Sequence, residues 1–345
     1  MENMQNQNGT EQYKQYTPKN RTKVPKGVKI FGIIIIVFVA ILILVNLVSP
    51  SSYQYSSANA GSVRDEHIAV LYLEGTIENG SPVISQSGSG YNQNWMLNTI
   101  YELMENDRNK GIVMYLNTPG GSVYATDEIY LALKEYKDVT GNPVYAAMGP
   151  TAASGGYYIA CIADKIYANR NTMTGSIGVI MGDFYDISQF LEDWGIQAES
   201  ITSGRNKGMG SYTEPMTQEQ REILQSIVDE SYGQFLDVVM KGRNMDVNTL
   251  KPLADGRIYS AQQALDAGLI DGIATLEDTI YKMIGDYQLR NCAIYDYYYT
   301  YSGGLWSWIF GKIDIEGISQ RNNEFQSVME MIENNTLTEP YYLAY

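Results

Sequence analysis

Residues 112–137 read IVMYLNTPGGSVYATDEIYLALKEYK, and the fold class follows from this stretch. Residues 112–116 are wholly apolar, which is typical of a strand covered on both faces of a parallel sheet. The turn signals of residues 117–122 come next, and apolar residues then recur at helical spacing as far as Lys137. The stretch therefore predicts a buried strand, a glycine-rich turn and a helix.

The same alternation continues on either side of this stretch. Residues 67–73 (HIAVLYL) are predicted to open the folded domain as a strand. A second strand at residues 144–148 leads into an apolar helix at residues 155–163, and a third strand follows at residues 166–168. Repeated β-α-β units with parallel strands place the domain in the α/β class. Residues 217–240 are predicted to form a long amphipathic helix that begins with a capping box.

An uncharged apolar segment, IFGIIIIVFVAILILVNLV, occupies residues 30–48. Its 19 residues would span about 28 Å as a helix, close to the ~30 Å thickness of a hydrocarbon core. Residues 1–29 carry six bases and two acids. The positive-inside rule therefore predicts a cytoplasmic basic tail at 1–29, a transmembrane signal-anchor at 30–48 and an extracellular remainder.

The remainder is expected to have three parts. Residues 49–65 are a Ser-rich tether, residues 66–290 the catalytic domain, and residues 291–345 a C-terminal extension and flexible tail. Residues 57–60 (SANA) resemble a small-residue cleavage site, so removal of the anchor as a signal peptide stays an alternative.

The net charge and the cysteines exclude several classes of protein. The net charge of −15 divides into +4 for residues 1–29 and −19 for the rest of the chain. An acidic external domain is a poor partner for nucleic acid. The two cysteines, Cys161 and Cys292, form no CxxC or His/Cys cluster, so a structural zinc site is not predicted. Cys161 lies in an apolar run and is expected to be a buried free thiol.

Ser154 stands in the stretch GPTAASGGYYIA (149–160), among small residues and before an apolar run. This position fits either a nucleophile or the cap of a buried helix. A serine nucleophile needs a base to take its proton. His67 is the single histidine and is expected at the surface, at the entrance of the first strand, so a Ser-His-Asp triad is not predicted. The GxSxG motif is also absent, because position 152 is alanine.

Lysine is the other base to consider, and Lys207 lies in the glycine-flanked stretch SGRNKGMG (203–210). A lysine serves as a base only where burial keeps it neutral before attack. Taken alone, the stretch is a weak signal, and an ordinary solvated lysine is the default interpretation.

Gly120 and Gly121 follow a predicted buried strand and precede a helix. Free backbone N–H groups can face an anion at such a place. The N–H of Gly155, directly after Ser154, would be a second donor to an oxyanion hole. Phosphate binding is the competing use of a Gly-Gly pair, but neither GxGxxG nor GxxxxGK[ST] occurs. No nucleotide or other cofactor is therefore expected.

Three motifs occur in order: LNTPGGSVYATDEI (116–129), GPTAASGGYYIACIADKIYANRNTMTGSIGVI (149–180) and SGRNKGMGSY (203–212). They resemble the signal peptide peptidase A family, membrane-anchored serine proteases with a Ser/Lys dyad. The likeness runs over about residues 68–273 and includes GRIYSAQQALDAGLID (256–271). With the apolar segment in front, the chain is similar to the short, single-repeat form of Gram-positive bacteria.

The resemblance implies a Clp protease/crotonase-like fold with Ser154 as nucleophile and Lys207 as general base. By analogy with that fold, Gly121 and Gly155 would supply the oxyanion hole. Four further residues are expected to line the site: Gly120, Gly175, Ser176 and Ser203. Either of the two serines would orient the lysine. Thr118 stands where many relatives have serine, and a loop hydroxyl is kept. Neither a metal nor a nucleotide is needed.

The resemblance also implies substrates and an assembly. The substrates would be remnant signal peptides and other apolar peptides near the outer leaflet. The family assembles into dome-like rings, octameric by resemblance, and its short form completes each site with residues of neighbouring protomers. Because 52 residues separate Ser154 from Lys207, we expect the two to meet across a subunit boundary.

The C-terminal region raises two further expectations. Residues 337–345 (LTEPYYLAY) look like an extended peptide with the small residue Ala344 after an aliphatic one. These are features of a signal-peptide cleavage product, so the tail is predicted to occupy the enzyme's own groove and to be trimmed there; simple disorder is the alternative. Residues 305–310, which include Trp306 and Trp308, fit either a membrane-surface contact or packing within the ring.

Three other functions stay open. A crotonase-type acyl-CoA enzyme would share the fold and the Gly-Gly oxyanion hole, but an external location argues against it because acyl-CoA is cytoplasmic. A non-catalytic, membrane-tethered scaffold would keep the ring and the anchor without turnover. A broader membrane-protein quality-control protease would differ only in the length of its substrates.

Overall fold

The computed structural model describes residues 63–79, 83–84, 90–299 and 341–343. The predicted cytoplasmic tail, the membrane segment at 30–48, almost all of the tether and most of the extension, including residues 305–310, lie outside this part. Of the helices in the described part, none combines the length and the apolar character that crossing a membrane requires.

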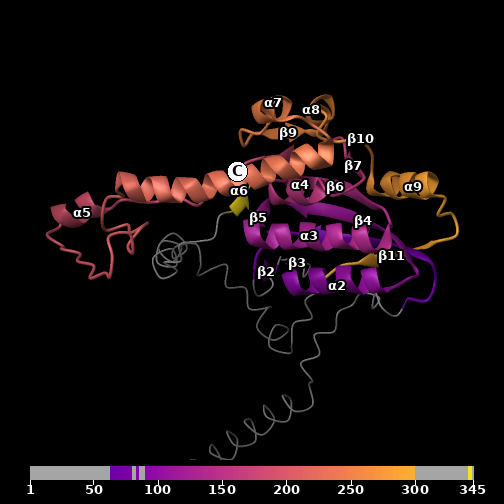
Figure 1. The fold of residues 1–345 in the computed structure, drawn as a ribbon, viewed down its shortest axis with the longest axis horizontal. Helices are drawn as coiled ribbons and strands as arrows, with labels where there is room; N and C mark the ends of the chain where they lie inside the picture. Colours follow the sequence, from indigo (N-terminus) through magenta and orange to yellow (C-terminus); the bar gives the residue numbers. More distant parts are fainter. Residues whose placement is uncertain (1–62, 80–82, 85–89, 300–340, 344–345) are drawn as a thin grey trace, which may run out of the picture. The chain divides into compact units, whose positions relative to one another are not determined.

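Eight strands form a sheet whose main path runs β10-β7-β6-β4-β1-β11, with parallel pairing at every step (Figure 1). Two strands lie off this path: β8 pairs parallel with β6 and antiparallel with β9. The strands are β1 (His67–Glu74), β4 (Asn109–Thr118), β6 (Val144–Ala153), β7 (Lys165–Ala168), β8 (Met173–Gly175), β9 (Ile258–Ser260), β10 (Gly272–Ile273) and β11 (Ala293–Tyr297). Two short antiparallel pairs join β2 (Val83–Ile84) to β3 (Gly90–Tyr91), and β5 (Gly120–Ser122) to β12 (Tyr341–Leu343).

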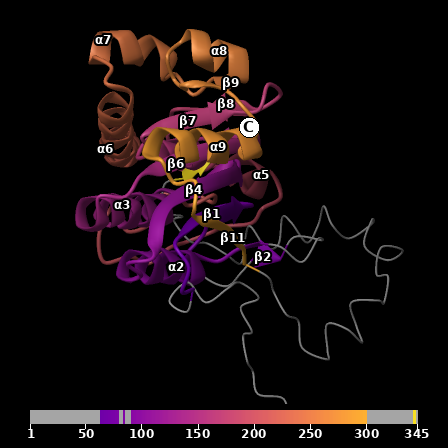
Figure 2. The same ribbon diagram turned by 90° about the vertical axis from the view of Figure 1, so that its right-hand side faces the viewer.

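Helices cover both faces of the sheet. They are α2 (Gln93–Glu105), α3 (Val123–Thr140), α4 (Gly155–Ala160), α5 (Ser188–Asp193), α6 (Gln218–Arg243), α7 (Val247–Leu250), the 3₁₀ helix η2 (Lys251–Leu253), α8 (Ala261–Asp266) and α9 (Leu276–Tyr287). In Figures 1 and 2, α2 and α3 lie side by side and α9 lies apart from them. Successive strand residues therefore face different cores. In β1, Leu71 belongs to the cluster with α2, α3 and α4, and Val70 to the cluster with α9.

The fold confirms the predicted α/β class, with buried strands and a central, mostly parallel sheet. This arrangement fits the Clp protease/crotonase-like fold. The predicted long helix is α6, whose first turn has the expected capping box between Thr217 and Gln220. The sheet continues past residue 290, where the sequence placed the end of the domain, because β11 pairs with β1 along the whole of β11.

The expectation of a surface histidine is wrong. His67 is fully buried, and its Nδ1 lies 3.0 Å from the carbonyl oxygen of Asp65. Its ring meets the edge of Tyr295 at 5.6 Å between centroids, and Nε2 lies 3.5 Å from the Tyr297 hydroxyl. Both tyrosines belong to β11, which the sequence assigned to the extension. Burial lowers the pKa of His67 and Lys110 lowers it slightly further, while Asp65 opposes the shift.

We predict that His67 makes the fold sensitive to acid. The fold favours the neutral ring, so His67 stabilises the protein above the ordinary imidazole pKa of 6.5 and loses this contribution as the pH falls through its lowered pKa. In urea titrations at about pH 7.5 and about pH 5, the free energy of unfolding should fall less in His67→Gln than in the wild type. An equal fall in both proteins would show that His67 does not titrate with folding.

Candidate active site

Ser154 occupies the sharp junction between β6 and α4. Its backbone angles are φ 54° and ψ −116°, a region that residues with a side chain rarely adopt. The Ser154 N–H donates to the carbonyl oxygen of Gly175 at 2.7 Å, which ties the junction to the end of β8. A strained residue between a buried strand and a helix is a recognised setting for a nucleophile.

The Ser154 side chain does not cap α4. The residue stands at the N-cap position, but its hydroxyl makes no capping hydrogen bond. It is fully buried, and Oγ has no hydrogen-bond partner among the described residues. A buried hydroxyl without a partner costs about 1–3 kcal/mol. The geometry excludes the side-chain cap, and the role of Ser154 as a nucleophile stays a prediction.

The second glycine of the Gly-Gly pair is fixed by a neighbouring segment. The Ile77 N–H donates to the Gly120 carbonyl oxygen at 2.8 Å, and the Ser122 N–H donates to the Ile77 carbonyl oxygen at 2.7 Å. A Cβ on Gly121 would lie 1.9 Å from that same Ile77 oxygen, so no other residue fits there. The hydroxyl of Thr118 accepts a hydrogen bond from the Gly120 N–H at 3.0 Å and thereby supports the turn.

Gly155 brings the two halves of the predicted oxyanion hole together. A Cβ on Gly155 would lie 2.6 Å from Thr126 Oγ1 and 3.3 Å from the Gly120 Cα. Helix α4 therefore begins in direct contact with the Gly-Gly strand. Gly155 opens α4, so its N–H is among those that lack a partner within the helix. Ser154, Gly155 and the pair Gly120–Gly121 thus lie within one small region.

Gly175 and Ser176 lie on the other side of the nucleophile. Ser176 is buried and also has a positive φ of 51°, and its N–H donates to the Arg257 carbonyl oxygen at 2.8 Å. This bond and the bond from Ser154 to Gly175 hold β8 between the nucleophile and the segment that leads into β9.

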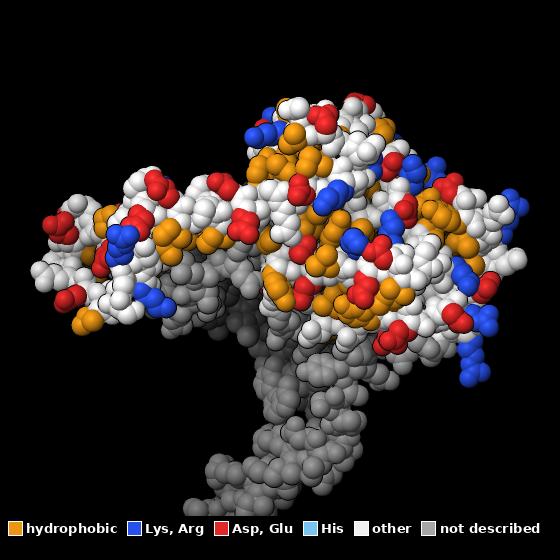
Figure 3. Space-filling model, in the orientation of Figure 1, with side chains coloured by type: hydrophobic (Ala, Val, Ile, Leu, Met, Phe, Trp, Pro, Cys, Tyr) orange, Lys and Arg blue, Asp and Glu red, His pale blue; other side chains and the backbone are white. Residues whose placement is uncertain are grey.

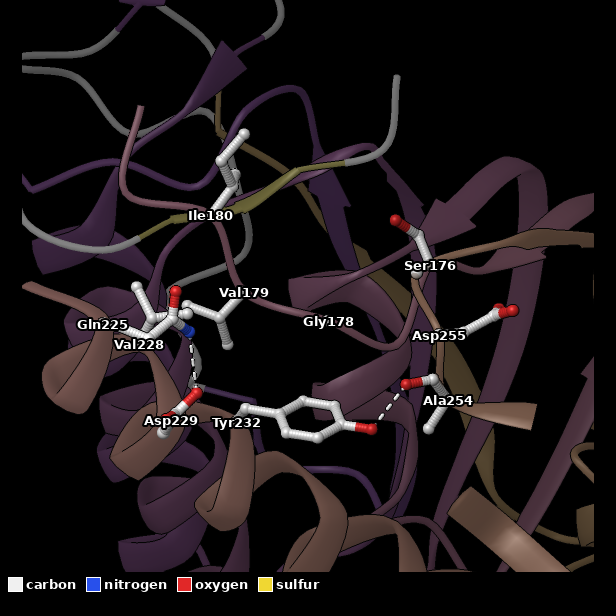
Figure 4. Close-up of a pocket in the computed structure, with 11 residues that line it drawn as sticks. Ser176, Gly178, Val179, Ile180, Gln225, Val228, Asp229, Tyr232, Ala254 and Asp255 are labelled. Atoms are coloured by element: carbon white, nitrogen blue, oxygen red, sulfur yellow. Dashed lines mark hydrogen bonds between the residues drawn. The ribbon is translucent and has the colours of Figure 1, made fainter. Parts of the chain in front are cut away.

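Beside Ser176 the structure has a cavity of about 460 Å³ (Figure 4). One wall comes from the segment after β8, with Val179 and Ile180, and the other comes from α6, with Val228 and Tyr232. The Tyr232 hydroxyl donates to the Ala254 carbonyl oxygen at 2.5 Å and closes one end. The polar side chains of Gln225, Asp229 and Asp255 also line the cavity, and Ser154 is not among its lining residues.

Two residues of the site carried no signal in the sequence. Ile77 lies in a segment with no motif, yet it holds Gly121 in place. Thr126 sits on α3 among ordinary helical residues, but it is fully buried against Gly155 and its hydroxyl has no partner. Both contacts join segments that are far apart in the chain.

The structure does not bring Lys207 to Ser154 within one chain. Lys207 and Ser203 are both solvent-exposed. Their loop is tied to the first turn of α6, where Arg205 pairs with Glu219 at 2.6 Å. Gln220 also donates to the Arg205 carbonyl oxygen at 3.3 Å.

The length of α6 sets the separation. The helix passes α4 fifteen residues further on, where Gln234 donates to the Tyr158 hydroxyl at 3.0 Å and the Phe235 ring lies 5.2 Å from the Tyr158 ring. Fifteen helical residues span about 22 Å. Lys207 is therefore held well beyond the reach of its own side chain from Ser154. Figure 1 shows the N-terminal half of α6 projecting away from the sheet.

Strand β12 lies along the glycine pair. It pairs antiparallel with β5, in the register Tyr341 with Ser122, Tyr342 with Gly121 and Leu343 with Gly120. An extended segment of this chain is thus hydrogen-bonded, strand to strand, at the predicted oxyanion hole.

Metal ligands are not clustered in the part of the chain that the structure describes: no group of three or more His, Cys, Asp or Glu side chains could hold an ion there.

Comparison with known proteins gives consistent matches. Residues 137–290 match peptidase family S49. A protein of Enterococcus faecium that is provisionally named signal peptide peptidase SppA is 34% identical over 280 residues, which are 81% of each chain. Protease 4 of Haemophilus influenzae is 29% identical over 62% of this chain and 34% of its own length. The chloroplastic serine protease SPPA of Arabidopsis thaliana is 30% identical over 62% of this chain and 32% of its own length.

We predict that Ser154→Gly stabilises the fold. Glycine adopts φ 54°, ψ −116° without a steric penalty, and the change also removes a buried hydroxyl that lacks a partner. The free energy of unfolding should rise by about 1 kcal/mol, measured by urea titration. Ser154→Ala keeps the strain and should gain less than half as much. Equal or lower stability of Ser154→Gly relative to Ser154→Ala would refute stored strain at this position.

Proposed function

The chain belongs to the signal peptide peptidase A family within peptidase family S49 and is a peptidase of the serine type, and on this premise we propose that Ser154 is its nucleophile. The observation that carries the proposal is that Ser154 has a strained backbone and a buried hydroxyl without a hydrogen-bond partner among the described residues. The adjoining Gly155 and the pair Gly120–Gly121 support an oxyanion hole made by the N–H groups of Gly121 and Gly155.

We further propose that Lys207 of a neighbouring protomer is the general base. Lys207 is exposed and its loop is held about 22 Å along α6 from the place where that helix passes α4. Enclosure by a second copy would remove the amine from water, which favours its neutral form. Ser203 of the same loop, or Ser176 beside the nucleophile, would orient the amine.

The reaction follows from these positions. The neutral Lys207 amine takes the proton of the Ser154 hydroxyl as Oγ bonds to the peptide carbonyl carbon. The carbonyl oxygen becomes an oxyanion held by the Gly121 and Gly155 N–H groups. The C–N bond then breaks, and the lysine gives its proton to the leaving amine. Water then attacks the acyl carbon and loses a proton to the lysine. The bond from the acyl carbon to Oγ breaks, the lysine gives the proton to Oγ, and the product leaves as a carboxylic acid.

The exposed side chains of one projecting part of the protomer, which we term the α6 arm, support assembly of the protomers into a ring. Helix α5, the loop that follows it and the N-terminal half of α6 carry a mixture of apolar, acidic and basic side chains (Figure 3). An exposed apolar surface of this kind is typical of a protein–protein contact. The large apolar residues exposed on and near this arm are Phe184, Tyr185, Phe190, Trp194, Ile196, Ile201 and Ile227.

We propose that the enzyme is anchored by residues 30–48 with its catalytic domain outside the cell. The substrates would be remnant signal peptides, whose apolar cores would contact Val179, Ile180 and Val228 in the cavity beside Ser176. The direct experiment is cleavage of a fluorogenic apolar peptide by the full chain. Ser154→Ala and Lys207→Ala should each lose more than about a thousandfold in kcat with no change in assembly size.

The shared site gives a quantitative prediction for mixed rings. Ser154→Ala subunits keep the lysine, and Lys207→Ala subunits keep the serine. If equal amounts of the two are co-expressed, about a quarter of the boundaries join an intact serine to an intact lysine. The mixture should therefore recover about a quarter of the wild-type kcat for peptide cleavage, although each variant alone is inactive.

The matched control is a ring in which every subunit carries both substitutions, which should stay inactive. A mixture with no more activity than its parents would contradict the shared site and would place both residues in one protomer. Activity in Lys207→Ala alone would show that the base is another group.

We also propose that the segment around β12 competes with substrate. Its antiparallel pairing with β5 is the geometry in which an extended peptide adds to an exposed strand. A tethered segment has a high effective concentration at its own groove, so it would exclude weak peptides. Trimming of the segment by the site would relieve this competition.

Deletion of residues 341–345 should raise kcat/KM for a short apolar peptide several-fold, because the strand beside Gly121 becomes open. The intact masses of wild type and Ser154→Ala report trimming separately: only the wild type should lose C-terminal residues. Unchanged kcat/KM after the deletion would remove the competition, and equal masses would remove the trimming.

A further inference from the structure

A second cavity, of about 580 Å³, lies at the carboxyl ends of the parallel strands. Its walls come from the C-terminal parts of β1 and β4, from the middle of β6, from the segment between β7 and β8, and from the start of α9. Crevices at the carboxyl ends of parallel strands are the usual ligand sites of α/β sheets. The mechanism proposed above makes no use of this cavity, which we term the tyrosine cavity.

Two tyrosine rings form one wall of the tyrosine cavity. The Tyr72 and Tyr115 rings lie 5.1 Å apart, inclined at 52°. Two residues that do not line the cavity hold the Tyr72 side chain. Its hydroxyl donates to Asp296 at 3.2 Å, and its ring makes a T-shaped contact with the Tyr298 ring at 6.3 Å between centroids. The ring faces are thus held in place rather than free to rotate.

Glu74 supplies a negative charge beside these rings. It lines the cavity and is half-buried, and its carboxylate makes no ion pair or hydrogen bond to another described residue. Its charge is felt by both rings. Burial, Asp296 and Glu74 together raise the pKa of Tyr72 to about 12, and burial with Glu74 raises the pKa of Tyr115.

The chemistry of the wall selects one class of ligand. None of the described residues that line the cavity is lysine, arginine or histidine, which disfavours an anion. One carboxylate is too few for a divalent metal. Aromatic faces with a neighbouring carboxylate attract an organic cation. Met148, Pro150 and Leu276 complete an apolar wall that suits the aliphatic stem of a lysine or arginine side chain.

The tyrosine cavity is within reach of a peptide at the nucleophile. Pro150 lines the cavity and lies four positions before Ser154 at the end of β6. Four extended residues span about 13 Å. An extended substrate bound at Ser154 could therefore place the side chain of a residue three to five positions from the scissile bond in this cavity.

We propose that the tyrosine cavity binds the ammonium or guanidinium group of a lysine or arginine side chain in the peptide substrate. The inference rests on the proposed peptidase function and makes it more specific. Signal peptides carry positive charges next to their apolar core, so this substrate class supplies such a group. The enzyme would recognise the basic flank at the tyrosine cavity and cut the apolar core at Ser154.

The test uses pairs of fluorogenic peptides that differ at one position, lysine against norleucine, three to five residues to either side of the scissile bond. The full-length wild type should cleave the best lysine peptide with a kcat/KM about tenfold above that of its norleucine partner. Glu74→Gln should bring this ratio close to one without changing kcat/KM for the norleucine peptide. Glu135→Gln, an exposed carboxylate on α3, is the matched control and should keep the ratio.

Substitutions at Tyr115 separate the aromatic face from the hydroxyl. Tyr115→Phe should keep the preference for lysine, whereas Tyr115→Leu should reduce it about threefold. Equal cleavage of lysine and norleucine peptides by the wild type would overturn the proposal. So would a preference for lysine that survives in Glu74→Gln.

A peptide-binding measurement distinguishes failure of the proposed peptidase function from failure of the tyrosine-cavity proposal. If no peptide is cleaved, fluorescence anisotropy of the labelled lysine peptide on the full-length Ser154→Ala chain decides the question. Tighter binding than the norleucine peptide, lost on adding Glu74→Gln, supports the tyrosine cavity on its own. Equal binding of the two peptides refutes it.

Discussion

The backbone conformation of Ser154 is the constraint on which the rest of the site depends. A side-chain-bearing residue at φ 54°, ψ −116° persists only where its surroundings determine it completely. Here the hydrogen bond to Gly175 fixes one side of the junction, and the contact of Gly155 with Gly120 and Thr126 fixes the other. The same contacts leave the hydroxyl unpaired, so stability is given up at the one position where a reactive group is useful.

The second constraint is the rigidity of α6. Its C-terminal half is anchored in the core by residues such as Phe235 and Val239, and its N-terminal half carries the Lys207 loop away from the sheet. One protomer therefore keeps the proposed base, Lys207, away from the proposed nucleophile, Ser154. If the base comes from a neighbour, peptide cleavage depends on assembly, and an isolated subunit is protected from cutting at random. The tyrosine cavity would add a second dependence, on the charge of the substrate.

Much of the fold could be predicted because it depends on short sequence patterns between near neighbours in the chain. The apolar run at 112–116, the turn after it and the capping box at Thr217 depend on neighbours in the chain, and the structure has each of them. Ser154, Gly120, Gly121 and Gly155 were also candidates from sequence, and the fold brings them together. His67 was wrongly expected at the surface, because its cover comes from β11, more than 200 residues away.

The sequence by itself determined the α/β class, the apolar segment at 30–48 and the residue types able to carry out acyl transfer, since composition, periodicity and short motifs are local properties. Only the tertiary structure decided that Ser154 is strained and does not cap α4, that Ile77 excludes any side chain at Gly121, and that Lys207 stands far from the nucleophile of its own chain. Each of these depends on contacts between distant segments, and such contacts exist only once the sheet has brought those segments side by side.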